Sequence, residues 1–525
     1  MAARQNIFRV RRSYNQWVAN QTLEDYALRF TAKSARRWSA ARVSNTALGA
    51  ISFLALEAIG GSITLHYGFD NAVAAILAVS LVIFLTAIPI SYYAARYGVD
   101  IDLLTRGAGF GYIGSTITSL IYASFTFIFF AIEAAIMAMA LEMLFGVPLV
   151  LGYLICSVVI IPFVIHGITT ISRFQVWTQP AFIFLQLVPF VFIVYADASS
   201  VSDWTQFEGL NPVDSGGFSI VMFGAAAAVV FSLIAQIGEQ VDFLRFIPEP
   251  RNAREKRRWW AAVMAGGPGW IVIGMLKILA GSFLAVLALK QGVTASEAAD
   301  PTQMYLIAFN YITHSPEISL AMAGIFVILC QLKINVTNAY AGSIAWSNFF
   351  SRLTHSHPGR VVWLFFNVAI ALLVMELGVY RALEETLGFY GIVAIAWVGS
   401  LVADLVINKP LGLSPAHIEF KRAHLYDINP VGVGAMLTAS VVGIICHTGI
   451  LGVYPEALSH FIAMGVALIM APLIAWKTGG RFYTARPFVP IATDHQLVQC
   501  TICEHHFEPE DLTHCPAYDG TICSL

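Results

Sequence analysis

The chain has 525 residues, of which 58% are hydrophobic and 12% are charged, and its mean hydropathy is +0.71. A soluble protein of this length does not need so much apolar surface, whereas a bilayer takes about 20 apolar residues per spanning helix. The formal net charge of -2 gives no indication of nucleic-acid binding. The composition therefore predicts an all-α multi-pass membrane protein, because helices satisfy their own backbone hydrogen bonds in lipid.

About twelve segments are long and apolar enough to span a bilayer. They lie near residues 46–66, 71–94, 116–144, 148–168, 175–196, 218–243, 260–289, 318–347, 361–379, 387–407, 430–450 and 456–476. These segments divide the chain into an N-terminal segment (1–45), a transmembrane domain (46–476) and a Cys-rich tail (477–525).

Lysine and arginine gather in alternate loops, and the opposite loops are short or acidic. The basic clusters are Arg36, Arg37 and Arg42; Arg96 and Arg106; Arg173; residues 251–258; Arg352 and Arg360; Lys409, Lys421 and Arg422; and Lys477, Arg481 and Arg486. Cytoplasmic loops carry an excess of Lys and Arg. Both termini are therefore predicted to be cytoplasmic.

A glycine pair, Gly60 and Gly61, lies inside the first predicted span. Glycine weakens a helix and permits unusual backbone angles, so the pair is compatible with an unwound segment at a transporter's binding site. Small residues also allow close packing of neighbouring helices. The spacing alone leaves both interpretations open.

Lys333 lies in the middle of the apolar segment 318–347. A charge at membrane depth is costly, so an intramembrane lysine is a functional hypothesis by default. Its candidate counter-charges are Glu57, Glu133 and, at greater distance, Glu239. A static ion pair, a proton-coupled switch and a direct substrate contact all remain open.

Asp242 and Arg245 lie at the inner end of the sixth predicted span. The simpler interpretation is a local surface pair that anchors the helix end. The alternative is a cytoplasmic gate that breaks when the protein opens.

Three groups of residues carry a family resemblance. They are the glycine-rich loop 106–111, the run 242–246, and Asn335, Asn338 and Tyr340 in the eighth span. Together they resemble the nucleobase–cation symport-1 family, and within it the bacterial cytosine permeases. The resemblance covers roughly residues 45–350 and extends more loosely to about 476.

The resemblance implies a LeuT-like fold, with a five-plus-five inverted repeat, two added helices, and interrupted first and sixth spans. It also implies a secondary transporter of a purine, pyrimidine, allantoin or hydantoin, working by alternating access in a bacterial inner membrane. Phe129 stands where family members commonly place a Trp that stacks on the heterocycle, and Glu133 follows one turn later. The expected substrate-binding residues are Gly60, Gly61, Phe129, Glu133, Ser232, Leu233, Gln236 and Asn335.

The expected sodium site departs most from the family. Where the family presents two adjacent hydroxyls to sodium, this chain has Lys333 and Ile334. Isoleucine offers no side-chain oxygen, and an ammonium would occupy the place of the cation. Lys333, with Glu57 as a partner, is therefore predicted to replace sodium and to make the protein sodium-independent, with proton coupling as one possibility.

The tail contains Cys500, Cys503, Cys515 and Cys523. Disulfides are disfavoured in the cytoplasm, and four thiolates with a CxxC pair suit tetrahedral zinc. Reduced thiols or redox sensing are the alternatives. The tail also resembles the Cys-rich junction of bacterial signalling proteins in which a permease-like module is fused to an output domain.

Two functions follow from these patterns. One is a transporter of a nucleobase-like heterocycle, and the other is a transporter-like sensor that signals through the tail to a downstream domain or protein. The membrane part contains no nucleophile–His–acid set, no phosphate loop and no catalytic metal motif, so neither an enzyme nor a cofactor is predicted there. The expected partners are the heterocyclic substrate and the lipid bilayer, without nucleic acid.

Overall fold

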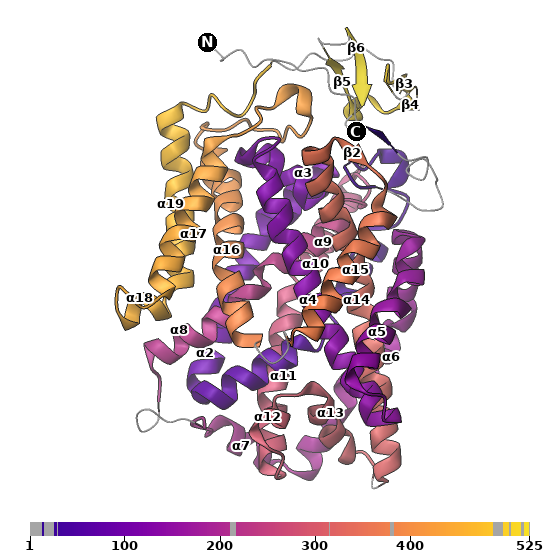
Figure 1. The fold of residues 1–525 in the computed structure, drawn as a ribbon, viewed down its shortest axis with the longest axis vertical. Coiled ribbons are helices and arrows are strands. Elements are labelled where there is room, and N and C mark those ends of the chain that lie inside the picture. The colour runs from indigo at the N-terminus through magenta and orange to yellow at the C-terminus, as the bar shows by residue number, and fades with distance from the viewer. Residues whose placement is uncertain are drawn as a thin grey trace.

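The chain folds into a bundle of long, roughly upright helices with a few short strands at one end (Figure 1). The structure is a computed structural model. It describes residues 13–14, 26–28, 30–210, 217–313, 315–378, 383–486, 497–502, 504, 506–515 and 519–523.

The helices follow the apolar segments of the sequence. Their bounds are α1 Ala40–Gly49, α2 Ala55–Tyr97, α3 Ile101–Thr105, α4 Ser115–Phe145, α5 Leu149–Ile165, α6 Ile168–Ala196, α7 Ser199–Thr205, α8 Ile220–Phe231, α9 Ile237–Leu244, α10 Ala253–Gly266, α11 Trp270–Lys290, α12 Ala295–Ala298, α13 Pro301–Asn310, α14 Pro316–Thr354, α15 Arg360–Glu376, α16 Leu383–Ala403, α17 Pro430–His447, α18 Val453–Ala457 and α19 Ser459–Thr478. Single turns of 3-10 helix lie at η3 Lys33–Ala35, η8 Arg422–His424 and η9 Pro509–Asp511. A π-helical turn, η4 Arg106–Phe110, follows α3, and a second, η7 Asp404–Asn408, follows α16.

Among the described residues, nine helices are long and apolar enough to cross a membrane. The longest, α2, contains two predicted spans, and non-helical Gly68 (φ 76°, ψ 169°) separates them. Two further predicted spans correspond to α5 and α15, which have 17 residues each. The apolar segments are thus helical as predicted, while the total of twelve spans stays a prediction.

The first span is interrupted at residues 50–54, between α1 and α2. The interruption does not fall at the glycine pair, so that reading of Gly60 and Gly61 is wrong. A Cβ at Gly60 would lie 1.8 Å from the Ile278 carbonyl oxygen of α11, and one at Gly61 would meet Met304. The pair therefore allows close packing of α2 on its neighbours.

The sixth span changes geometry without leaving the helical region. It runs as α8, then as 3-10 helix over η5 Ser232–Gln236, and continues as α9. The predicted break in the first span is therefore confirmed, whereas the sixth span stays helical and departs from α-helical geometry only over η5.

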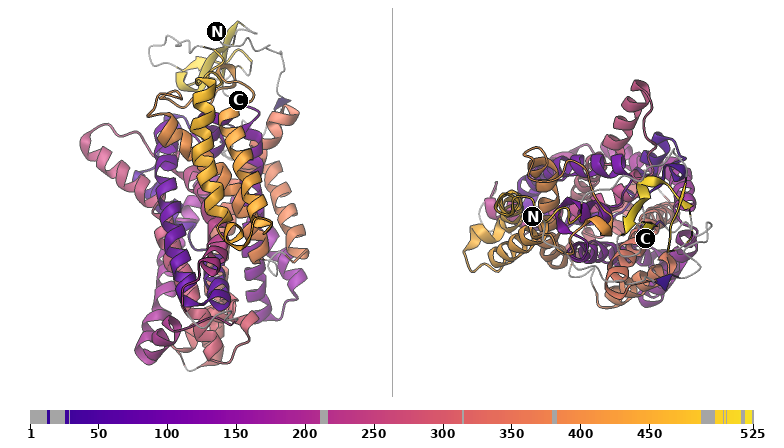
Figure 2. Two further views of the ribbon diagram at one scale, coloured as in Figure 1. Left: turned by 90° about the vertical axis from the view of Figure 1, so that its left-hand side faces the viewer. Right: turned by 90° about the horizontal axis from the view of Figure 1, so that it is seen from above.

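The strands lie at the end of the bundle that also holds α3 and the basic loops (Figure 1). They form three two-stranded sheets: β1 Ser13–Tyr14 with β2 Ser356–His357, β3 Val498–Gln499 with β4 His506–Phe507, and β5 Leu512–Cys515 with β6 Gly520–Cys523. The short helices α7, α12 and α13 lie at the opposite end, and Figure 2 shows the same division from a second direction. We call the strand-bearing end the inner end and the opposite one the outer end.

Candidate substrate and ion site

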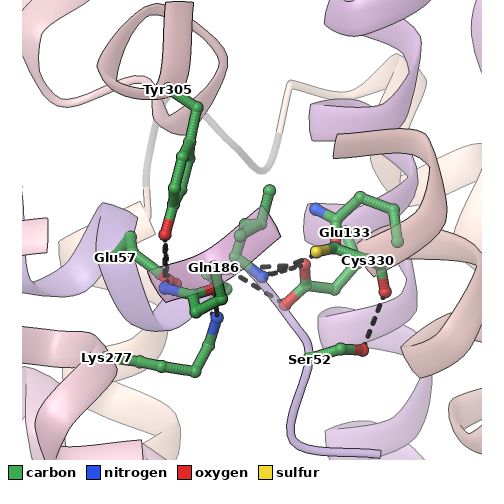
Figure 3. A network of polar contacts seen from close by, with 10 residues as sticks. Ser52, Glu57, Glu133, Gln186, Lys277, Tyr305 and Cys330 are labelled. Carbon is green, nitrogen blue, oxygen red and sulfur yellow. Dashed lines mark hydrogen bonds and ion pairs between the residues drawn. The ribbon is translucent and has the colours of Figure 1, made fainter. Parts of the chain in front are cut away.

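The start of α2 is held by a carboxylate from α4. The backbone N–H of Leu54 donates to Glu133 Oε2 at 3.2 Å, and that of Ala55 donates to Glu133 Oε1 at 3.3 Å (Figure 3). The first N–H groups of a helix have no partner within it, and the positive end of the helix dipole favours an anion there. Glu133 is fully buried, so its carboxyl group occupies the position at the start of the broken helix where an anion would otherwise be favoured.

The non-helical residues 50–54 are fixed between α4 and α14. Ser52 Oγ donates to the Cys330 carbonyl oxygen at 2.9 Å (Figure 3). The Phe53 ring meets the Phe129 ring edge-on, with centroids 6.3 Å apart. Phe129 is thus beside the interruption, where its face or edge can contribute about 0.5–1.5 kcal/mol in contact with another ring.

Toward the outer end, Glu57 of α2 is the centre of a buried polar network. Its Oε1 atom accepts hydrogen bonds from Lys277 Nζ of α11 at 2.7 Å and from Tyr305 Oη of α13 at 3.0 Å (Figure 3). Gln186 of α6 donates to the Tyr305 hydroxyl at 2.6 Å and accepts from Lys277 at 3.2 Å. Gln186 also donates to Glu57 Oε1 at 3.3 Å, so four helices are joined through one carboxylate oxygen, while Glu57 Oε2 has no hydrogen-bond partner.

Lys333 of α14 points toward α6. Its ammonium donates to the Gln175 carbonyl oxygen at 3.1 Å and to Thr178 Oγ1 at 3.0 Å. The Gln175 side chain in turn donates to the Lys333 carbonyl oxygen at 2.7 Å, which fixes α6 against α14. The neighbouring Ile334 is buried and provides no side-chain oxygen.

The predicted counter-charges of Lys333 are wrong. Glu57 pairs with Lys277, Glu133 caps α2, and Glu239 accepts a hydrogen bond from an amide three residues earlier in the sixth span. Within the described part of the chain, no carboxylate lies within ion-pair distance of Lys333. The lysine is held by neutral oxygen atoms, because the acids expected beside it are engaged elsewhere.

The predicted residues of the sixth span make local contacts. Ser232 Oγ donates to the Val229 carbonyl oxygen at 2.7 Å, and Gln236 Nε2 donates to Glu239 Oε2 at 2.9 Å. Leu233 is fully buried in the core. These residues line the 3-10 segment, but their recorded contacts do not join them to Glu133.

Asn335 retains unused hydrogen-bonding capacity. Its Oδ1 accepts from Asn338 Nδ2 at 3.5 Å, while Asn335 Nδ2 and Asn338 Oδ1 have no partner. Both side chains are fully buried. An unsatisfied buried amide costs roughly 1–3 kcal/mol, so a donor and an acceptor are available for a ligand here.

Lys277, Gln186 and Tyr305 are absent from the residues predicted above. Lys277 carries the same signal as Lys333, namely an ammonium in the middle of an apolar segment. Gln186 and Tyr305 have no comparable signal, because a single amide or phenol is common in a span or a loop.

At the inner end, Arg245 pairs with Asp100 at 3.2 Å, and both side chains are fully buried. Asp242 instead accepts a hydrogen bond from the Tyr122 hydroxyl at 2.9 Å. The simpler prediction of a surface pair between Asp242 and Arg245 is therefore wrong. The buried contact joins the sixth span to the loop after α2 and closes this end of the bundle.

Three of the four cysteines of the predicted zinc site, Cys500, Cys515 and Cys523, lie in the described part of the tail. Cys523 N donates to Cys500 Sγ at 3.4 Å, so these two residues are adjacent. In the β5–β6 ladder, Cys523 is opposite Leu512, whereas Cys515 is opposite Gly520. Cys515 and Cys523 therefore face opposite sides of the hairpin, about 10 Å apart along the strands. Cys503 lies outside the described residues.

Comparisons with known proteins agree with this architecture. The structure is similar to Mhp1, a nucleobase-cation-symport-1 family transporter in a closed conformation with bromovinylhydantoin bound (TM-score 0.65, 15% identity, covering 87% of this chain and 95% of that one). It is also similar to the inward-facing conformation of Mhp1 (TM-score 0.62, 15% identity, covering 87% and 93%) and to a Na+-coupled sialic acid symporter (TM-score 0.54, 15% identity, covering 87% and 94%). No curated protein sequence matches the chain.

These neighbours are membrane transporters rather than enzymes, and they share the LeuT-like fold of this chain. The family model for permeases of cytosine and purines, uracil, thiamine and allantoin matches residues 31–470. The match includes all the helices named above up to most of α19. The chain therefore belongs to this family, the nucleobase–cation symport-1 transporters.

Proposed function

We propose that this protein is a sodium-independent secondary transporter of a nucleobase-like heterocycle, of the purine, pyrimidine, allantoin or hydantoin class. It works by alternating access around the interrupted first span and the 3-10 segment of the sixth span. We propose a five-plus-five inverted repeat with two added helices, twelve spans in all, in a bacterial inner membrane. The basic inner end faces the cytoplasm, in keeping with the positive-inside rule.

The observation that carries sodium independence is the environment of Lys333. A sodium ion needs several oxygen ligands, and here a lysine and an isoleucine stand where the family resemblance expects two hydroxyls. The lysine already uses the Gln175 carbonyl and the Thr178 hydroxyl as acceptors. A second cation beside a charged ammonium would also be repelled.

The substrate is proposed to bind between α4, α14 and the interrupted first span. Phe129 provides an aromatic surface, and Asn335 and Asn338 provide an unpaired donor and an unpaired acceptor. Glu133 already fills the anion-binding start of α2, which favours a neutral or protonated ligand with N–H donors over an anion. Ser232, Leu233 and Gln236 form the opposite wall in this proposal.

Proton coupling is the accompanying proposal. Lys333 has neutral partners, so loss of its proton leaves no carboxylate uncompensated nearby. Proton release from Lys333 can therefore reset the transporter without breaking the Glu57–Lys277 pair. A buried amine without a counter-charge is a suitable group for this, since its charge is stabilised only by two oxygen atoms.

The test is uptake of labelled cytosine, adenine, uracil, allantoin and hydantoins into proteoliposomes, in sodium-free buffer with an inward proton gradient. We expect accumulation of at least one compound and no increase when sodium is added. The matched variant Lys333→Ser/Ile334→Thr restores two hydroxyls and should become sodium-dependent. A wild-type uptake rate that rises steeply with sodium contradicts the proposal.

The second candidate function is a sensor with a transporter's architecture, which the docked position of the tail supports. Net flux separates the two candidates, because a sensor binds its ligand without releasing it on the other side. Binding of the same labelled compounds without uptake, by a correctly folded preparation, would favour the sensor.

A further inference from the structure

The C-terminal module, defined here as the described residues of 497–523, packs on the short segment 31–39 that leads into α1. We call this segment the entry segment. Glu508 accepts hydrogen bonds from the backbone N–H groups of Lys33 at 2.8 Å and Ser34 at 3.0 Å. These are the first two residues of η3, so Glu508 caps that turn in the way that acidic residues cap helix starts. Glu510 adds a contact of 2.7 Å to Lys33 Nζ.

The same module is also fixed to the loop between α16 and α17. Lys421 Nζ donates to the Leu512 carbonyl oxygen at 3.0 Å, and His424 Nε2 is in hydrogen-bond contact with Thr513 Oγ1. Lys421 and His424 are both buried. The C-terminal module therefore bridges two parts of the inner end that are nearly 400 residues apart in sequence.

The loop after α9 meets the entry segment as well. Glu249 lies 3.8 Å from Lys33 Nζ and 3.7 Å from Arg36. The Arg36 guanidinium is buried and donates to the Thr31 carbonyl oxygen, while Thr31 N donates to the Gly98 carbonyl oxygen at 2.8 Å. The entry segment is thus held by the module, by the sixth-span loop and by the end of α2.

The charges of the Lys33–Glu510 pair are both present at neutral pH. Partial burial is the largest single effect and disfavours the carboxylate. The hydrogen bond from Lys33, a backbone hydrogen bond and the charges of Lys33 and Lys421 together outweigh burial and lower the pKa of Glu510 below its ordinary value. The same hydrogen bond raises the pKa of Lys33. The stability that the Glu510 carboxylate contributes is therefore present at neutral pH, and it is lost only as the pH falls through the lowered pKa of Glu510. Each partner is about half exposed, so this pair adds little, and the Glu508 cap and the buried contacts of Lys421 and His424 contribute more.

The helix that follows the entry segment is separate from α2. α1 ends at Gly49 and is joined to α2 only through the non-helical residues 50–54. Alternating access in this class of fold moves one helix group against another around a fixed site. If α1 swings outward during opening, the entry segment must move with α1. The entry segment then either separates from the C-terminal module or moves together with the module.

We propose that the C-terminal module is a latch that holds the inner end closed, so that opening toward the cytoplasm requires release of η3 from Glu508 and Glu510. The latch does not depend on which compound is transported. The latch gives the tail a defined role, because the inner end opens only when the C-terminal module releases η3.

Hydrogen–deuterium exchange of the full chain tests the latch without knowledge of the substrate. Glu508→Ala/Glu510→Ala should raise the exchange of α1 amides roughly fivefold, which corresponds to loss of a typical helix cap. Asp203→Ala is the matched control, since it removes an exposed ion pair with Lys290 at the outer end. The control should leave α1 unchanged.

Equal α1 exchange in the wild type and in Glu508→Ala/Glu510→Ala overturns the proposal, even if the module itself becomes more exchangeable. A second measurement uses Lys33→Cys/Glu510→Cys closed with a short bismaleimide reagent. Cross-linking should lower α1 exchange below that of the untreated variant, whereas the single variants and the wild type with the same reagent should not change. Unaltered α1 exchange after complete cross-linking also contradicts the latch.

Discussion

The buried acids near the site have distinct tasks. Glu133 stabilises a helix start, whereas Glu57 compensates the charge of Lys277. Lys333, by contrast, is held by a carbonyl and a hydroxyl. Two buried glutamates, and likewise two buried lysines, therefore have different roles because they bind different partners.

The Glu57–Lys277 pair should be essential for stability. Lys277→Met leaves a buried carboxylate uncompensated, and breaking a buried pair costs roughly 3–5 kcal/mol. We expect a large fall in the thermal unfolding temperature of the purified protein, with partial recovery in Glu57→Gln/Lys277→Met. Lys290→Met, which removes an exposed pair with Asp203, is the control and should have little effect. A double variant no more stable than Lys277→Met alone would contradict this account.

At this scale the sequence indicates which residues matter better than it indicates their partners. An ammonium in an apolar segment is recognisable, and Lys277 could have been found by that criterion together with Lys333. The choice between Glu57 and Glu133 as a partner depends on how four helices pack. That packing is not contained in the local pattern of any one of them.

Among the elements, α2 shows how two neighbouring features can be confused. The helix begins just after an interruption and contains a glycine pair one turn further on. Gly60 packs against the Ile278 carbonyl, and Gly281 of α11 faces the Glu57 backbone in return. The two helices are thus in contact at backbone distance at two points next to the Glu57–Lys277 pair.

Gly60→Ala should separate α2 from α11. A Cβ at this position would lie 1.8 Å from a backbone oxygen. The free energy of unfolding should therefore fall by more than the roughly 1–3 kcal/mol typical of overpacking. Gly465→Ala in α19 is the matched control, because an added Cβ there meets nothing within 4 Å. The control should be neutral or gain up to about 1 kcal/mol from helix propensity. Equal unfolding temperatures for the two variants would be inconsistent with the packing described here.

Hydropathy predicts the helices well, since a helix that spans a bilayer needs a long run of mostly apolar residues. It does not locate the interruption in the first span. Residues 50–54 are Ala, Ile, Ser, Phe and Leu, none of which breaks a helix strongly. The interruption depends on Glu133 and Cys330, which come from distant parts of the chain.

For the whole molecule, the tail is the part that the sequence describes least completely. The cysteine spacing predicts a four-thiolate site, but strand register separates Cys515 from Cys523. Alternation of side chains along a strand decides this point, and it becomes visible only once the hairpin partner of each residue is known.

Metal analysis of the purified protein tests what remains of the zinc proposal. Cys500→Ser should lower the zinc content, because Cys500 is adjacent to Cys523. Cys515→Ser should leave the zinc content unchanged and serves as the matched control. Equal loss of zinc in both variants would show that all four thiolates bind one ion after all.

The position of the C-terminal module has a consequence for anything that binds it. Linkage between two sites is reciprocal. If a ligand that favours the inward-open state loosens the module by some factor, a partner that binds the loosened module must raise the affinity for that ligand by the same factor. A protein that binds residues 508–513 would therefore change the apparent affinity of the proposed substrate site for its heterocycle. Occupancy of the substrate site and occupancy of the C-terminal module would then be coupled through η3, a single turn of 3-10 helix.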